Sequence, residues 1–134
     1  MLALMWLGES SASPLEDYVL HCMGCHGSQA EGVPGRIPPL AHSLGHFLRS
    51  AAGRNYVLRV PGAANSALSN GQLAAVLNWL LSEFNSKEVP PGTPPFTAAE
   101  LQVWRSKPLP AVLATRQSIV STLAASGAAP ATHY

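Results

Sequence analysis

The sequence predicts an all-α protein made of short helices, and three observations carry this prediction. Residues 13–16 and 69–72 both have the capping-box pattern, a serine followed three positions later by Glu or Gln. After the second box, apolar residues recur at spacings of three and four, the repeat of an amphipathic helix. The chain also holds 12 Pro and 11 Gly, with only 11% charged residues. That composition is typical of short helices joined by ordered, proline-rich connections.

Length and charge bound the possibilities further. A chain of 134 residues allows one hydrophobic core of modest size. The formal net charge of +1 argues against binding to nucleic acid. Residues 1–13 look like the end of a secretory signal, because a short apolar run is followed by small residues with a possible cleavage site at 10–12. This run is too short to cross a bilayer, so we do not expect an integral membrane protein.

The first helix begins at residue 14, where Pro14 occupies the first helical position. Leu15, Tyr18, Val19 and Cys22 then follow the helical repeat. We therefore expect these four side chains on the buried face, so that the helix delivers Cys22 to the core.

This helix leads into the stretch Cys22-Met23-Gly24-Cys25-His26, a C-x-x-C-H pattern. The pattern is typical of covalent haem attachment, because one short turn presents both thiols to the porphyrin and places the histidine below the iron. Two alternatives stay open. A thioredoxin-like thiol pair would follow a strand, and no β-branched run precedes Cys22. A zinc site needs four ligands, for which only His42 and His46 offer a second pair.

A loop rich in Gly and Pro follows the motif and ends in Pro38-Pro39-Leu40. A helix ending in C-x-x-C-H-G, this loop and Pro-Pro-Leu together resemble the class I cytochromes c. The resemblance implies one covalent haem c, attached through Cys22 and Cys25, with His26 as an iron ligand. It also implies that Pro38 or Pro39 offers its carbonyl to the other ring nitrogen of His26. Because haem is attached in this family on the outer face of the bacterial inner membrane, the resemblance further implies a periplasmic location.

The resemblance covers roughly residues 14–85, and we expect a haem domain over 14–88. Leu44, Phe47, Leu48 and Ala51 follow the helical repeat, and apolar residues continue to a break at residues 61–62. The strongest helix begins after Ser69. In the family, the last core helix packs across the first one through an aromatic residue, for which Trp79 is the candidate. The apolar positions of this last helix are Leu73, Val76, Leu77, Leu80, Leu81 and Phe84.

The chain departs from the family at the sixth iron ligand, which is usually a methionine before the last core helix. Val60 stands in that place, and no methionine follows Met23. The ligand is then His46, which we favour, or His42, or the iron site is open. If residues 43–52 form a regular helix, however, both histidines lie opposite its apolar face.

Beyond the haem domain we expect a stiff Pro-rich strap at 89–96, a helical extension at 97–125 and a flexible tail at 126–134. Thr97-Ala98-Ala99-Glu100 has a capping pattern, and Pro108 or Pro110 opens a further helix. Because these helices are amphipathic, we expect them to pack on the haem domain. The alternative is that the extension binds a dehydrogenase partner.

The resemblance implies electron transfer, and we expect a carrier that turns over no substrate by itself. It would pass single electrons from a periplasmic dehydrogenase or other oxidoreductase to a respiratory acceptor. The alternative is a haem-based ligand-binding or sensor protein with an open sixth site. Between Glu31 and Glu83 lie four arginines and no acidic residue: Arg36, Arg49, Arg54 and Arg59. These arginines either neutralise haem propionates or form a docking face for an acidic redox partner.

Overall fold

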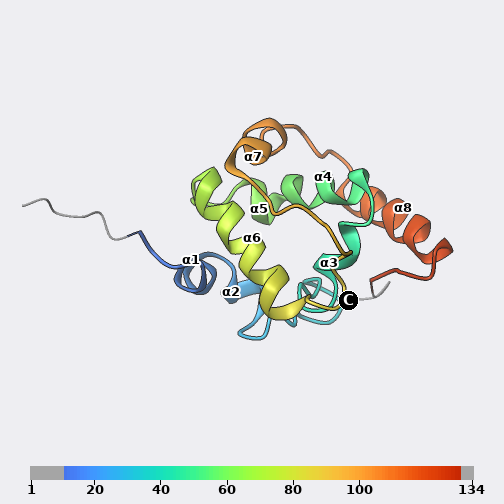
Figure 1. Ribbon diagram of the computed structural model, residues 1–134, viewed down its shortest axis with the longest axis horizontal. Coiled ribbons are helices and arrows are strands. Elements are labelled where there is room, and N and C mark those ends of the chain that lie inside the picture. Colours follow the sequence, from blue (N-terminus) through green and yellow to red (C-terminus); the bar gives the residue numbers. More distant parts are fainter. Residues whose placement is uncertain (1–10, 131–134) are drawn as a thin grey trace, which may run out of the picture.

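The computed structural model describes residues 11–130, which form the bundle of short helices shown in Figure 1. In this part of the chain the only β pairing is an isolated bridge between Val33 and Ile37, so the all-α prediction is confirmed. Most of the expected signal segment lies outside the described residues, as do positions 131–134 of the expected tail. The helices are α1 Pro14–His21, α2 Met23–His26, α3 Leu44–Phe47, α4 Ala51–Arg59, α5 Pro61–Ala64, α6 Asn70–Phe84, α7 Ala98–Trp104 and α8 Val112–Ala125.

Helix α1 begins as the sequence predicts, but it buries a narrower face. The Ser13 side chain accepts from the Glu16 amide, and Glu16 reaches back to the Ser13 amide, which completes the capping box. Tyr18 is buried, whereas Leu15 and Val19 are 51% and 42% exposed. Of the four side chains expected on the buried face, Cys22 is half-buried, and the prediction is wrong for Leu15 and Val19. Helix α1 lies at the edge of the bundle and packs mainly on α6, so only the side of the helix that carries Tyr18 is covered.

Helix α6 is the central element of the core. Its predicted start is confirmed, and its predicted apolar face is buried except at Phe84, which is partly buried. Ser69 and Gln72 form the second capping box. Each of its fully buried leucines contributes about 2 kcal/mol by leaving water. The Trp79 ring lies 5.3 Å from the Tyr18 ring, centroid to centroid, so this aromatic does join the first and last helices of the haem domain. The buried apolar residues of α6 are Leu73, Ala74, Val76, Leu77, Leu80 and Leu81.

Residues 43–52 do not form one regular helix, because the segment is divided between α3 and α4. Helix α3 ends at Phe47, and α4 starts at Ala51 because the Ser50 hydroxyl accepts from the Gly53 amide at 3.0 Å and caps the new helix. Gly53 packs directly on the Phe47 carbonyl, where a β-carbon would overlap it. Capping and close approach therefore fold α4 back over the turn. At the expected break, Pro61 opens the short helix α5.

The C-terminal extension packs back on the rest of the molecule. Thr97 caps α7 by accepting from the Glu100 amide at 3.1 Å, as its sequence pattern predicts. Helix α7 contacts α6 and α4, and α8 contacts α3 and α4. Helix α8 starts at Val112, a little later than the expected openings at Pro108 or Pro110. Within residues 11–130 no helix has the length and the apolarity needed to cross a membrane.

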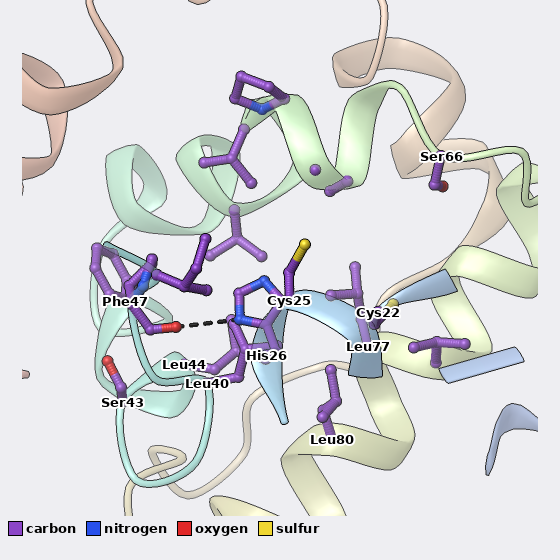
Figure 2. Close-up of a pocket in the computed structure, with 18 of the residues that line it drawn as sticks. Cys22, Cys25, His26, Leu40, Ser43, Leu44, Phe47, Ser66, Leu77 and Leu80 are labelled. Atoms are coloured by element: carbon purple, nitrogen blue, oxygen red, sulfur yellow. Dashed lines mark hydrogen bonds between the residues drawn. The ribbon is translucent and has the colours of Figure 1, made fainter. Parts of the chain in front are cut away.

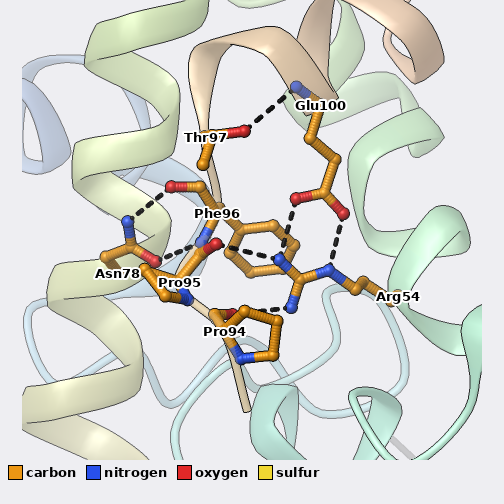
Figure 3. Close-up of polar contacts among 7 residues, drawn as sticks. All are labelled: Arg54, Asn78, Pro94, Pro95, Phe96, Thr97 and Glu100. Atoms are coloured by element: carbon orange, nitrogen blue, oxygen red, sulfur yellow. Dashed lines mark hydrogen bonds and ion pairs between the residues drawn. The ribbon is translucent and has the colours of Figure 1, made fainter.

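Arg54 fastens the strap and α7 to α4. Its guanidinium donates to both carboxylate oxygens of Glu100, at 2.6 and 2.8 Å, and to the carbonyls of Pro94 and Pro95 (Figure 3). The same guanidinium lies 4.2 Å from the centroid of the Phe96 ring. These groups belong to the strap or to the extension, so the Arg54 side chain holds both segments on α4.

Two further arginines make similar ties. Arg59 of α4 donates to the carbonyls of Lys107 and Pro108. In the opposite direction, Arg105 at the end of α7 donates to the carbonyl of Ala64, the last residue of α5, and to those of Ser66 and Leu68, between α5 and α6. These contacts join the extension to α4, to α5 and to the segment that leads into α6.

Candidate functional site

The C-x-x-C-H stretch forms a tight turn that places both thiols and the imidazole at one cavity. The Cys22 carbonyl accepts from the amides of Cys25 and His26, at 3.2 and 3.0 Å, and this contact starts the single turn of α2. Both cysteines are free thiols; Cys22 is half-buried and Cys25 is exposed. The three side chains therefore converge without a disulfide between them.

The cavity has a volume of about 360 Å³ and is lined almost entirely by apolar side chains (Figure 2). Its volume lies in the range of about 300–1,000 Å³ that is usual for cofactor sites. Leucines of α6 form one wall, α4 and α5 another, and the loop from Ile37 to Leu40 a third. Helix α8 completes the lining with Val112 and Arg116. The cavity is therefore built from both the haem domain and the extension.

The His26 ring is oriented by a single backbone contact. Its Nδ1 lies 3.1 Å from the Pro38 carbonyl oxygen, and as the carbonyl can only accept, Nδ1 carries the proton. The other ring nitrogen, Nε2, then keeps its lone pair for a metal ion. Burial lowers the pKa of His26, which favours the neutral ring that a metal requires. Of the two prolines that the sequence suggests for this contact, the structure places Pro38 there, while Pro39 lines the cavity beside it.

A second set of contacts fixes the loop that carries Pro38. The Tyr18 hydroxyl donates to the Gly27 carbonyl at 2.6 Å and so ties α1 to the residue that follows His26. Burial is the main cause that raises the pKa of Tyr18 to about 12, so the hydroxyl stays a donor. Gly27 has φ +82°, and its α-carbon packs on the Glu31 carboxylate. No residue with a β-carbon would fit at Gly27 without moving that carboxylate.

The electrostatics of the Cys22 thiol argue against the thioredoxin-like alternative. Burial raises the pKa of Cys22, and Asp17 and Cys25 raise it further. A reactive redox pair requires the opposite shift, which stabilises a thiolate. The zinc alternative also lacks support, because residues 11–130 contain no group of three or more His, Cys, Asp or Glu side chains placed to hold a metal ion.

The donor set fits haem c. The cavity offers two free thiols, the His26 imidazole with a free ring nitrogen and a largely apolar lining. Cys22 and Cys25 would hold the haem through thioether bonds, Nε2 of His26 would bind its iron, and the apolar walls would pack on the porphyrin.

Comparison with known proteins gives an independent result. No family model matches the chain. A cytochrome c-552 of Thermus thermophilus is 31% identical over 118 residues, which cover 73% of this chain and 90% of the relative. The chain belongs to the class I cytochrome c family. A second cytochrome c-552, also of Thermus thermophilus, is 28% identical over 141 aligned positions, with 89% of this chain and 95% of the relative covered. The cytochrome therefore carries one covalently attached haem c and transfers electrons.

The face of the cavity across from His26 is aliphatic. In Figure 2 the pale green segment of α4 and α5 lies on the far side of the cavity from the turn that bears His26. Val57, Val60 and Ala63 of this segment line the cavity. Val60, which stands in the expected place of the methionine ligand, therefore does face the cofactor cavity, but its side chain has no donor atom.

The structure does not bring His46 or His42 to the cavity lining. Leu44 and Phe47 of α3 do line it, and His46 lies on another side of that short helix. The Nδ1 atom of His46 is buried and has no hydrogen-bond partner among the described residues. His42 is largely exposed and pairs with Glu88, at 3.0 Å between Nδ1 and Oε1.

Sequence reasoning missed Arg116, a buried side chain that lines the cavity. A signal was present in the sequence. Arg116 falls four positions after Val112 and three before Ile119, on the apolar repeat of α8. A charged residue in the middle of an apolar helix face indicates a buried side chain with a polar or charged partner, because charged residues without a partner are rarely found in a core.

Proposed function

We propose that this cytochrome is a periplasmic carrier that passes single electrons from a periplasmic oxidoreductase, such as a dehydrogenase, to a respiratory acceptor. The observation that supports the proposal most directly is the convergence of Cys22, Cys25 and His26, with its Pro38 contact, on an apolar cavity. The haem supplies a one-electron couple when it is bound.

The residues of the cavity set the conditions for that couple. The Pro38 carbonyl fixes the tautomer of His26 and increases its basicity, which strengthens its bond to the metal. The leucine and valine walls exclude water, so little solvent rearranges as the charge changes. Cys25 and the neighbouring His21 are exposed, so the edge of the haem attached to Cys25 would lie at the surface. An electron can enter or leave there without a channel.

The arginines that were candidates for a docking face divide into two pairs. Arg54 and Arg59 hold the extension, as described above. Arg36 and Arg49 are exposed. We propose that an acidic partner docks through this second pair, because opposite charges speed the encounter of redox proteins.

Electron transfer and location are tested separately. Stopped-flow oxidation by an acidic redox protein should slow as ionic strength rises, and an Arg36→Gln/Arg49→Gln variant should reduce this salt dependence. The double variant Lys87→Gln/Lys107→Gln removes the same charge at two other exposed positions and serves as the control. Cell fractionation should recover the haem-bearing chain with periplasmic marker proteins. Equal salt slopes in both variants would count against the docking pair, and recovery in the cytoplasm would count against the location.

A second candidate function, binding of a small ligand at an open iron site, is favoured by the aliphatic wall of Val57, Val60 and Ala63 across from His26. His46 remains the endogenous ligand to test first, although it would have to rotate into the cavity. A low-spin ferrous spectrum that carbon monoxide leaves unchanged, and that His46→Ala converts to high spin, supports the closed carrier. A high-spin spectrum with rapid carbon monoxide binding, unchanged by His46→Ala, supports the ligand-binding protein.

A further inference from the structure

Arg116 is the cationic side chain that the extension contributes to the haem cavity. It is only 5% exposed, and its Cζ lies 5.7 Å from the centroid of the Phe47 ring. Val112, one helical turn earlier, lines the same cavity. Helix α8 therefore turns a face into the cavity that is aliphatic at one turn and cationic at the next.

The charge balance of the cavity lining is positive. Among the described residues that line it, Arg116 is the one Lys or Arg, and no Asp or Glu is present. A guanidinium is always charged near neutral pH and has five N–H donors, so it can bind an anion in addition to its contacts with the protein. The lining thus offers a cation to a carboxylate that the cofactor brings.

The position of Arg116 matches the acidic edge of haem c. The two propionates lie on the porphyrin edge away from the vinyl groups to which the thiols attach. In Figure 2, Phe47 and Ser43 lie at the end of the cavity opposite Cys22. Since Arg116 lies over the Phe47 ring, its guanidinium belongs to that far end.

We propose that Arg116 forms an ion pair with a haem propionate, so that the C-terminal extension is part of the cofactor site and sets its reduction potential. The pair would be charge-assisted and bidentate in character, which a planar guanidinium provides and an ammonium does not. A cation at this place disfavours the oxidised haem, which carries one more positive charge than the reduced form. It also holds the propionate ionised. This proposal rests on the bound haem and is independent of which partners exchange electrons with it.

The test compares purified holoprotein variants by redox titration over a range of pH. Arg116→Leu should lower the reduction potential at neutral pH. In a plot of reduction potential against pH, protonation of the propionate produces a bend. Arg116→Leu should move this bend to a pH higher by about one unit or more, because the carboxylate loses its cationic neighbour. Arg49→Leu removes an equal charge from an exposed position outside the cavity and is the matched control. Arg116→Lys should restore the potential in large part, since the charge is kept.

Two results would overturn the proposal. One is a folded Arg116→Leu holoprotein whose potential and pH profile differ from the wild type by no more than those of Arg49→Leu. The other needs no variant, and it applies even if the neutral substitutions fail to fold. The paired propionate should stay ionised above about pH 6, so the wild-type potential should be flat from there to about pH 8. A bend in the potential between about pH 6 and about pH 8 would contradict the ion pair if the infrared band of a protonated carboxyl shows that the propionate titrates there.

Discussion

Replacement of Asn85 should test how the proximal side of the haem cavity is held together. Asn85 caps the end of α6 and is fully buried. Its Oδ1 accepts from the Gly45 amide at 3.0 Å, and its Nδ2 donates to the carbonyls of Leu40 and Leu80, at 3.1 Å each. One side chain thus joins the end of α6, the start of α3 and the loop that continues from Pro38.

The magnitude follows from the group that Asn85→Ala leaves without a partner. The Leu80 carbonyl can still accept within its helix, and the Leu40 carbonyl still accepts from the amides of Ser43 and Leu44. The Gly45 amide is therefore the buried group that loses its partner. At about 1–3 kcal/mol for a buried unsatisfied group, the free energy of unfolding should fall by about 1–3 kcal/mol. That is a measurable part of the roughly 5–15 kcal/mol that stabilises a domain of this kind.

The assay is guanidinium unfolding of the holoprotein, followed by circular dichroism and by the haem absorption band. Asn65→Ala, at an exposed cap of α5, is the matched control and should change stability by no more than about 0.5 kcal/mol. Asn85→Asp keeps the acceptor for Gly45 but loses the donor and buries a charge, so its folded-state pKa rises. Its stability should then be highest in acid and fall as pH rises through that folded-state pKa. A loss below about 1 kcal/mol for Asn85→Ala would refute this reasoning.

Three further predictions follow from single contacts. The pKa of Tyr18 is about 12 in the folded protein against an ordinary value of 10, so the Tyr18 hydroxyl ionises first in the unfolded chain. The free energy of unfolding should therefore fall between about pH 10 and about pH 12. Denaturation at high pH should show a smaller fall for Tyr18→Phe. Gly53→Ala should lower the free energy of unfolding by about 1–3 kcal/mol, since the new methyl overlaps the Phe47 carbonyl, whereas Gly71→Ala, at an open helical position, should not. Arg54→Met should cost about 1–3 kcal/mol in denaturant unfolding, since it leaves the half-buried Glu100 unpaired.

Each of these predictions has a result that would contradict it. Identical alkaline stability profiles for wild type and Tyr18→Phe would mean that the buried hydroxyl is not the group that titrates. Equal stabilities of Gly53→Ala and Gly71→Ala would show that the turn before α4 relaxes freely. If Arg54→Met is no less stable than Arg36→Met, an exposed control, the ties of Arg54 to the strap and α7 do not stabilise the fold.

Much of the proximal half of the molecule could be predicted from the sequence, because its determinants are local. A capping box needs two residues three apart, and both boxes form as expected. The C-x-x-C-H spacing closes one turn whatever surrounds it, so Cys22, Cys25 and His26 converge on one cavity. The burial of α6 follows directly from its apolar repeat. In each case the sequence separation is short, and the backbone alone brings the groups together.

Other features required the tertiary structure, because contacts between distant segments decide them. Leu15 and Val19 follow the helical repeat but lie exposed, since α1 packs mainly on α6 and its other side is not covered. Arg54 and Arg59 hold the extension through residues more than 40 positions away, which no local pattern reveals. The side of α3 that faces the cavity, and the burial of Arg116 in its wall, depend on how α8 packs on α3 and α4. The sequence by itself therefore determined how the cofactor is attached and held from one side. Only the packing of the extension decided what the cofactor's other surroundings are.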